Sequence, residues 1–239
     1  TRGDTVINLG NGGNGPLMEL ATLKEYAEPI RPKKIIWIYY EGNDLADDLP
    51  VEESIPLLMN YLNPLFSQRL IHKQKDIDSS IYKFISEEML KIEKRLKSAL
   101  SWVDSDINQE KNDFSLSNFL RLVRLCGFIQ LEGAFLSTLY FSDNDINPLF
   151  IELLTTARNH SLTWGGQFYF VHIPIPSKAT KKDVIGAVRK LNIPVIDIYQ
   201  EIFDSNPNWP SLFPLGVKMG HYSPEGYKKI AEVIVSEIP

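Results

Sequence analysis

The chain has 239 residues, a formal net charge of −5 and 44% hydrophobic residues. A chain of this length can bury a full core, and its ordinary composition indicates a globular protein. The acidic balance disfavours nucleic acid or an anionic membrane surface as the main partner. The single cysteine, Cys126, excludes an internal disulfide and a cysteine-based metal cluster.

No stretch of the sequence has the length and apolarity expected of a membrane span, and none has the pattern of a signal peptide. The sequence begins with Thr1 rather than with methionine. We therefore expect the chain to be a segment of a longer precursor, so that the lack of a targeting signal assigns no compartment.

The first elements are predicted as a strand, a loop and a helix. The β-rich run Thr5–Leu9 predicts a short strand, and four glycines follow within residues 10–15. Such a loop can adopt positive φ angles and bring backbone N–H groups close to a ligand. Apolar residues then recur at helical spacing from Leu17 to about Glu28, and Pro16 suits the first turn of that helix.

The stretch Lys34–Leu45 contains an unbroken apolar and aromatic run from Ile35 to Tyr40. A short run of this kind predicts a strand that is buried on both faces. It ends on residues 41–44, Glu-Gly-Asn-Asp, and the carboxyl ends of strands are where open α/β sheets carry their chemistry. Strand, loop, helix and strand in this order predict a right-handed parallel crossover.

Between residues 46 and 147 the apolar residues recur at helical spacing, which predicts a helical insertion over one end of the sheet. The remaining pattern predicts helix, strand, helix, strand and a closing helix that Ser223 caps. The insertion helices are expected within Ile55–Leu70, Ile81–Leu100 and Phe119–Phe128, and the later elements at Pro148–Asn159, Gln167–Ile175, Lys181–Leu191, Ile193–Ile198 and Glu225–Ile238.

Three segments are expected to meet at one edge of the sheet: the glycine loop, residues 41–44 and the turn that contains His221. A backbone N–H donor, the side-chain amide of Asn43 and an imidazole base are the parts of acyl-transfer chemistry. The set lacks a nucleophile. No pair of histidine and carboxylate residues has metal-ligand spacing, so no metal is inferred.

These segments resemble the sequence blocks of the SGNH (GDSL-type) hydrolases. Residues 8–14, Asn-Leu-Gly-Asn-Gly-Gly-Asn, are similar to the second block, and Gly-Asn-Asp within residues 41–44 is similar to the third. Gly220-His221, before the final helix, is similar to the fifth. The resemblance covers roughly Val6–Asp44 and Phe168–Ile238 and does not extend to the insertion.

The resemblance implies a flavodoxin-like, three-layer α/β/α sandwich with a parallel sheet, in which residues 1–239 form one domain that lacks its N-terminal strand. It implies a serine ester hydrolase or O-acyl (acetyl) transferase without a cofactor. The implied partner is a small ester or acylated carbohydrate, and the implied location is extracytoplasmic or in the cell envelope. The insertion is expected to decide the substrate.

Carried onto this sequence, the resemblance assigns a role to three residues. Gly13 would give its backbone N–H and Asn43 its side-chain amide to an oxyanion hole, and His221 would be the general base that activates a serine. The residues expected to contact the substrate beside them are Asn14, Glu41 and Asp44.

The chain departs from the family pattern at two places. It has no Gly-Asp-Ser block, and we reject Thr5 of Gly3-Asp4-Thr5 as the nucleophile because it leads into a predicted strand and abuts the second block. We expect the serine to lie N-terminal to residue 1 or on another chain. The family's aspartate three residues before the histidine is Lys218 here, which leaves Asp197, Asp204, a Ser–His dyad or a loss of catalysis as alternatives.

Other interpretations stay open. Asn43-Asp44 could cap the next helix, and His221 could be a structural histidine in a turn. Because the loop also spells Gly-x-Gly-x-x-Gly, a nucleotide-binding α/β domain is one alternative function, although the expected acidic residue is at best Glu41. A catalytically inactive SGNH-like domain that binds a glycan or acts as a scaffold is the other. His172, inside an apolar strand, is predicted to be a core residue.

Overall fold

The computed structural model describes residues 5–107, 146–175, 183–204, 206, 208–216 and 221–239, without the side chains of residues 96, 98–107 and 201. The chain divides into two compact units, Thr1–Gln68 with Phe141–Pro239, and Arg69–Tyr140. The predicted helix Phe119–Phe128 lies outside the described residues.

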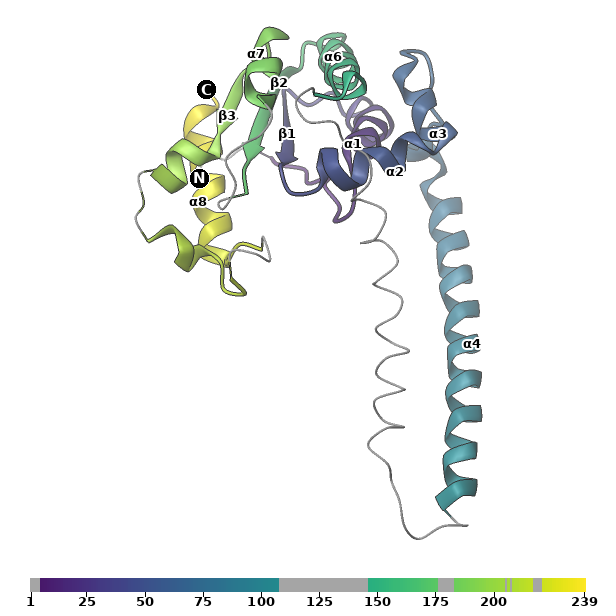
Figure 1. Cartoon of the computed structure of the whole chain (residues 1–239). Helices are drawn as coiled ribbons and strands as arrows, with labels where there is room; N and C mark the ends of the chain where they lie inside the picture. Colours follow the sequence, from purple (N-terminus) through teal and green to yellow (C-terminus); the bar gives the residue numbers. More distant parts are fainter. Residues whose placement is uncertain (1–4, 108–145, 176–182, 205, 207, 217–220) are drawn as a thin grey trace. The chain divides into compact units, whose positions relative to one another are not determined.

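The centre of the first unit is a parallel sheet of three strands. They stand side by side in the order β1 (Lys34–Tyr40), β2 (Gln167–Ile173) and β3 (Val195–Asp197) (Figure 1). The predictions of a parallel sheet and of an α/β class are confirmed. The connections from β1 to β2 and from β2 to β3 both contain helices, as parallel strands require.

The helices of the first unit follow the predicted order. Pro16 is the first residue of the first helix, and the Oγ of Ser223 accepts a hydrogen bond from the Gly226 N–H (3.1 Å) at the start of the last one, as predicted. Their bounds are α1 (Pro16–Thr22), η1 (Leu23–Ala27), η2 (Asp44–Asp48), α2 (Leu49–Glu53), α3 (Pro56–Met59), η3 (Asn60–Leu62), α6 (Pro148–Leu162), α7 (Val184–Lys190), η6 (Tyr199–Asp204), η7 (Trp209–Leu212) and α8 (Pro224–Glu237).

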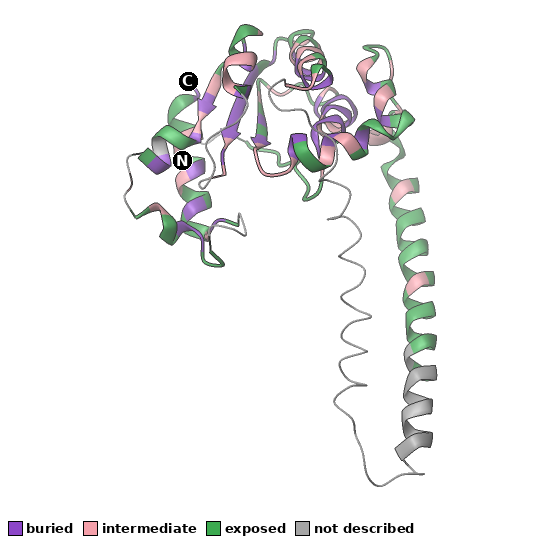
Figure 2. Ribbon diagram, viewed as in Figure 1, coloured by how far each residue is buried: buried purple, intermediate pink, exposed green. Residues whose placement is uncertain are grey.

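Hydrophobic residues pack against both faces of β2. Phe168 and Phe170 belong to a core cluster with residues of α1, α6 and α7. Tyr169 and Val171 belong to a second cluster with residues of η6, η7 and α8. Successive side chains of a strand point to opposite faces, so the two clusters lie on opposite sides of the sheet. Figure 2 shows β2 buried along most of its length.

Strand β1 is buried on one face only. Trp37 and Tyr39 are buried in the first cluster, but Ile36 and Ile38 are 41% and 45% exposed. β1 is at the edge of the described sheet, and α8 packs against residues of β2 and β3 rather than of β1. The prediction that this strand is covered on both faces is therefore wrong within the described residues.

The predicted strand Thr5–Leu9 is not a strand in the structure. Val6 and Ile7 are 82% and 53% exposed, and no described strand pairs with them. A β-rich composition forms a strand only where a neighbouring strand accepts its backbone hydrogen bonds. That partner is missing from the described residues, which explains the wrong prediction.

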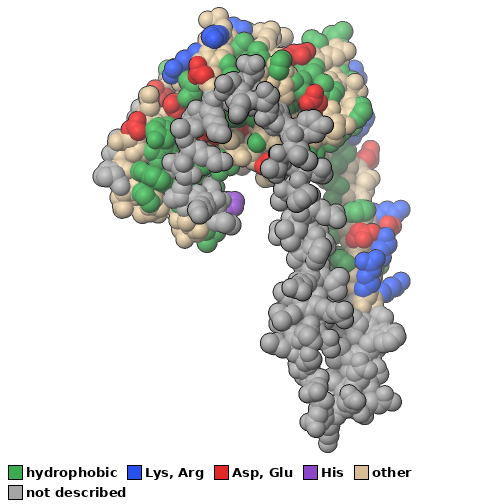
Figure 3. All heavy atoms as spheres, viewed as in Figure 1, with side chains coloured by type: hydrophobic (Ala, Val, Ile, Leu, Met, Phe, Trp, Pro, Cys, Tyr) green, Lys and Arg blue, Asp and Glu red, His purple; other side chains and the backbone are tan. Residues whose placement is uncertain are grey.

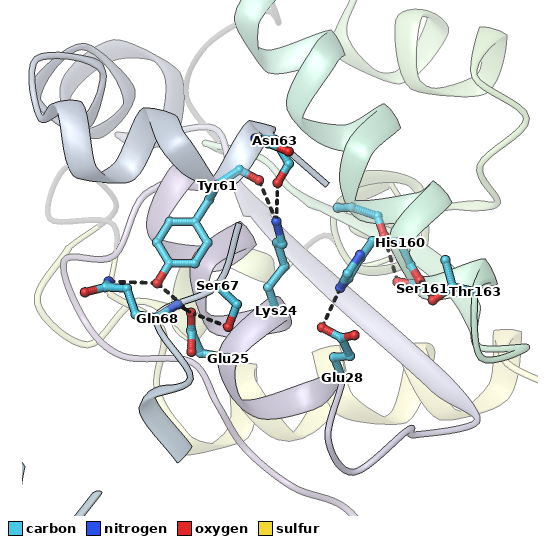
Figure 4. Close-up of polar contacts among 11 residues, drawn as sticks. Lys24, Glu25, Glu28, Tyr61, Asn63, Ser67, Gln68, His160, Ser161 and Thr163 are labelled. Atoms are coloured by element: carbon cyan, nitrogen blue, oxygen red, sulfur yellow. Dashed lines mark hydrogen bonds and ion pairs between the residues drawn. The ribbon is translucent and has the colours of Figure 1, made fainter. Parts of the chain in front are cut away.

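Buried polar groups on η1 anchor the segment that follows α3. The Nζ of Lys24 donates to two backbone carbonyl oxygens of that segment, at 3.1 and 2.6 Å. The Oε1 of Glu25 accepts hydrogen bonds from Tyr61 Oη (2.8 Å), Ser67 Oγ (3.0 Å) and the Gln68 N–H (2.5 Å) (Figure 4). The part of the predicted insertion up to Gln68 is thus tied into the first unit.

The second unit is described as far as Ile107. A short 3₁₀ helix, η4 (Leu70–Lys73), leads into the 34-residue helix α4 (Gln74–Ile107). The predicted helix Ile81–Leu100 is confirmed as part of α4, whose described side chains are mostly exposed (Figure 2). Within the described ranges, no helix combines the length and apolarity that crossing a membrane requires.

Candidate functional site

The glycine loop makes a tight turn with an accessible backbone. The N–H of Asn14 donates to the carbonyl of Asn11 (3.2 Å), and Gly13 between them has φ = 84°. This combination fits a type II turn, which needs glycine at its third position. A Cβ on Gly13 would meet no atom within 4 Å, so its glycine is required for the backbone angle and not for space. Among the described residues, nothing accepts a hydrogen bond from the Gly13 N–H.

The end of the glycine loop is held by a carboxylate from α2. The two side-chain oxygens of Glu52 accept hydrogen bonds from the N–H groups of Gly15 (2.7 Å), Leu17 (2.8 Å) and Met18 (3.4 Å). Gly15 itself gives α1 no side-chain cap, so the buried Glu52 satisfies the first-turn donors instead. A Cβ on Gly15 would lie 2.5 Å from the Cβ of Asp48, which explains why this position is glycine.

Asn43 starts the π-helical turn η2. Its carbonyl oxygen accepts the N–H groups of Asp47 (2.8 Å) and Asp48 (3.0 Å), and its side-chain Nδ2 donates to Oδ2 of Asp48 (2.6 Å). The Asn43 side chain does not bond the first-turn N–H groups of η2, so it is not a side-chain cap. The second N–H of Nδ2 has no acceptor among the described residues.

Asp44 and Glu41 bond the backbone around the end of β1. The Oδ2 of buried Asp44 accepts the N–H of Tyr40 (2.9 Å), and Oε2 of Glu41 accepts the N–H of Ile175 (3.1 Å) beyond the end of β2. Both carboxylates thereby fix the carboxyl ends of the two strands. In the structure the side chains of Asp44 and Glu41 accept hydrogen bonds from backbone N–H groups. The substrate contacts predicted for Asp44, Glu41 and Asn14 stay predictions.

Four carboxyl groups lie close together beside the glycine loop. Burial, followed by the charges of Asp44, Glu52 and Asp48, raises the pKa of Glu19 well above its usual value. Burial, with the charges of Asp48 and Glu52, raises the pKa of Asp44 to about 7, although the Tyr40 N–H acts in the opposite direction. At neutral pH Asp44 is therefore partly protonated, so the cluster holds less negative charge than four carboxylates would.

The turn that contains His221 reaches the carboxyl edge of the sheet. His221 is exposed, whereas the next residue, Tyr222, is buried and its Oη donates to the carbonyl of Pro174 (3.5 Å), just after β2. Burial, with the neighbouring Tyr40 and Tyr227, raises the pKa of Tyr222. Tyr222 therefore contacts the carboxyl end of β2 and lies within electrostatic range of Tyr40, the last residue of β1. Asn43 and the His221 turn thus adjoin the same end of the same two strands.

No carboxylate contacts His221 within the described part of the chain. Lys218, at the position of the family's aspartate, lies outside the described residues. Asp204 is exposed. Asp197 is bound elsewhere: its Oδ1 accepts hydrogen bonds from His172 Nδ1 (3.2 Å) and from the Tyr199 N–H (3.1 Å).

The pair of His172 and Asp197 comes from opposite positions on β2 and β3. Burial alone would raise the pKa of Asp197, but the hydrogen bonds from His172 and Tyr199 hold it below its usual value. His172 is buried and stacks on Tyr39, and its Nε2 has no partner among the described residues. The prediction that His172 is a core residue is confirmed, and Asp197 as the partner of His221 is corrected.

Comparison of the chain with protein-family models, curated proteins and solved structures finds no match. Within the described ranges, no group of three or more His, Cys, Asp or Glu side chains could hold a metal ion. On the face drawn in Figure 3, acidic and basic side chains of the first unit are interspersed rather than gathered by sign. The site must therefore be interpreted from its own residues.

Sequence reasoning missed the carboxylates that hold this site together. Glu52 contacts a backbone 37 residues earlier in the chain, and no local pattern indicates such a contact. For Asp48 the sequence gives only a weak indication. Asp48 lies four residues before Glu52, a spacing that places both side chains on one side of a helical turn. The pairing of His172 with Asp197 follows from the strand register, which the sequence does not specify.

Proposed function

We propose that this chain is part of an SGNH-type serine ester hydrolase or O-acyl transferase whose nucleophile comes from outside these 239 residues. The observation that carries the proposal is the arrangement at the carboxyl edge of the sheet. An exposed backbone N–H at Gly13, an amide N–H at Asn43 and the turn of His221 are carried by segments that adjoin this edge.

The donors suit an oxyanion because nothing described occupies them. The Gly13 N–H and the second Nδ2–H of Asn43 have no acceptor in the described part of the chain, and preorganised donors of this kind stabilise the negative charge of a tetrahedral intermediate. Partial protonation of Asp44 near neutral pH limits the negative charge beside these donors. Less negative charge there favours the developing oxyanion, while the carboxyl groups around the donors still disfavour an anionic substrate, so the proposed substrate is a neutral ester.

In the proposed cycle, the serine Oγ attacks the ester carbonyl while His221 accepts its proton. The carbonyl oxygen becomes an oxyanion that the Gly13 N–H and Asn43 Nδ2 hold, and His221 returns the proton to the leaving alcohol. Water, or a sugar hydroxyl in a transferase, then attacks the acyl-enzyme and releases the serine. The proposed substrate is a small ester or an O-acetylated carbohydrate, by analogy with the family alone.

A catalytically inactive SGNH-like domain that binds a glycan is the second candidate. The observation that favours it is that no described carboxylate orients His221, because losing that carboxylate from a triad lowers turnover by about four powers of ten. We do not propose a nucleotide-binding domain. The first-turn N–H groups of α1, which a phosphate would need, are already bonded to Glu52, and the surrounding carboxyl groups repel anions.

The proposal is tested by replacing His221 in the full-length protein. We expect His221→Ala to lower turnover of p-nitrophenyl acetate by about 1,000-fold or more, because the serine then lacks a base. His72→Ala, which removes an exposed histidine of the second unit, is the control and is expected to leave turnover unchanged. Equal turnover in wild type and His221→Ala would refute the role of His221.

A second test needs only the coding sequence upstream of Thr1. A strand followed by Gly-Asp-Ser within about fifty residues, which allows for one strand, helix and loop, would supply the nucleophile. If no such block lies there, the enzyme is ruled out for this polypeptide, and the inactive binding domain becomes the better proposal.

A further inference from the structure

Two carboxylates on one helical turn each bind one of the two segments that carry the donors of the proposed oxyanion hole. Asp48 ends η2 and Glu52 lies four residues later in α2, so their side chains project from the same side. Asp48 bonds the amide of Asn43, and Glu52 bonds the backbone at the exit of the glycine loop. Both side chains would collide with a Cβ on Gly15, so they lie directly against that loop.

Asp48 decides which way the Asn43 amide faces. A carboxylate only accepts hydrogen bonds, so the amide nitrogen and not its oxygen must point at Oδ2, 2.6 Å away. A nitrogen fixed in this way has its second N–H directed at a defined angle away from Asp48. That N–H is the one proposed to bind the oxyanion. The two backbone bonds from Asp47 and Asp48 to the Asn43 carbonyl fix the other end of the residue.

Glu52 fixes the glycine loop by the same means. Its three accepted hydrogen bonds fasten the residues two to five positions after Gly13, and charge-assisted bonds of this kind are the strong ones. A Cβ on Gly13 would meet no atom within 4 Å, and the other described side-chain bond to this loop is the one that the Gly10 N–H donates to Asn8 Oδ1 (3.0 Å). The position of the Gly13 N–H therefore depends on how firmly the loop is held at Gly15.

We propose that Asp48 and Glu52 are positioning residues that set the two donors of the oxyanion hole relative to each other. This inference depends on the proposed function for its catalytic consequence. Both carboxylates extend from one short turn, residues 48–52. A shift of this turn therefore moves both donors together. Neither residue needs to touch the substrate, and Asp48 acts through Asn43 alone.

The test is a double-mutant cycle on turnover of p-nitrophenyl acetate by the full-length protein. We expect Asp48→Ala to lower kcat by about 10- to 100-fold with KM nearly unchanged, because the donor acts in the transition state. Asp48→Asn keeps an acceptor oxygen, so we expect it to lower kcat less than Asp48→Ala does. Asp47→Ala removes an exposed neighbouring carboxylate and is the matched control, with kcat near that of wild type.

The decisive comparison is made in an Asn43→Ala background. If Asp48 acts through Asn43, Asp48→Ala has no further effect there, whereas an effect as large as in wild type overturns the inference. Failure of the proposed function is distinguishable, since Asn43→Ala would then leave turnover unchanged. In that case the NMR chemical shifts of the Asn43 side-chain amide protons are compared in wild type and Asp48→Ala. Changed shifts in Asp48→Ala support the positioning role, and unchanged shifts overturn it.

Glu52 is tested by Glu52→Gln, which keeps one acceptor oxygen and avoids the loss of folding that alanine risks. We expect a lower kcat and a changed resonance of the Gly13 amide, since the loop is held by fewer strong bonds. A Gly13 resonance and a kcat equal to those of wild type would show that Glu52 only caps α1.

Discussion

Glu19 and Asp44 are carboxyl groups that the fold buries beside others of the same charge. Oε2 of Glu19 is out of contact with solvent and has no partner among the described residues. Only the Tyr40 N–H offsets the burial of Asp44. Neighbouring carboxylates repel each other, which favours protonation of one of them. The free energy of unfolding therefore depends on pH through these groups.

We expect Asp44→Asn to stabilise the protein at alkaline pH. The folded-state pKa of Asp44 is about 7 and its usual value 3.8, so the folded state binds more protons in that window and stability falls as pH rises through it. Asparagine can still accept the Tyr40 N–H but has no charge to bury. The gain is expected to be near zero at pH 4 and up to ~4 kcal/mol at pH 8.

Urea unfolding of wild type and Asp44→Asn at both pH values measures this difference. Asp47→Asn, on the exposed side of the same turn, is the control and should show almost no pH-dependent gain. A gain for Asp44→Asn that is the same at pH 4 and pH 8 would contradict a raised pKa.

Short motifs in the sequence mark Gly13, Asn43 and His221 as candidate donors and base, and these roles stay predictions. The groups that orient them could not be predicted. Glu52 and Asp48 are ordinary acidic residues of a helical stretch until the fold brings them to Gly15 and Asn43. Long-range contacts of single side chains leave no periodic signal in one sequence.

Among the elements, those with a strong periodic pattern were predictable and those that depend on a partner were not. The strands β1, β2 and β3 and the helices α1, α6, α7 and α8 lie within or close to their predicted ranges. Thr5–Leu9 has the composition of a strand but no described neighbour, and β1 is exposed on one face because no β1 residue belongs to the cluster that α8 forms with β2 and β3. The π-helical turns have no sequence pattern that distinguishes them from α-helix.

The attachment of residues 60–68 to η1 depends on a buried hydrogen-bond network. Tyr61 Oη donates to Glu25 and accepts from Gln68 Nε2 (2.8 Å), so Tyr61→Phe leaves a buried carboxylate and an amide each short of one bond (Figure 4). We expect a loss of about 1–3 kcal/mol in the free energy of unfolding.

Thermal or urea unfolding measures this loss. Tyr82→Phe, at an exposed position of α4, removes the same hydroxyl without a described partner and should change stability by less than about 0.5 kcal/mol. Equal stabilities of the two variants would argue against a role of the Glu25 network in holding this segment.

At the scale of the whole molecule, every residue of the candidate site belongs to the first unit. The second unit, Arg69–Tyr140, is built in its described part around α4 and contributes none of the proposed catalytic groups. The proposal therefore assigns the chemistry to the α/β unit. The chain supplies a base and two oxyanion donors in this proposal, and the attacking serine must come from outside its 239 residues.

The most direct test of this account is the reaction of the full-length protein with a fluorophosphonate probe. The Oγ of an activated serine attacks its phosphorus, fluoride leaves, and the labelled peptide identifies the serine. We expect one serine outside these 239 residues to be labelled, with a rate that falls at least about 100-fold in His221→Ala and is unchanged in His72→Ala. No labelled serine, or an equal labelling rate in His221→Ala, would contradict the account.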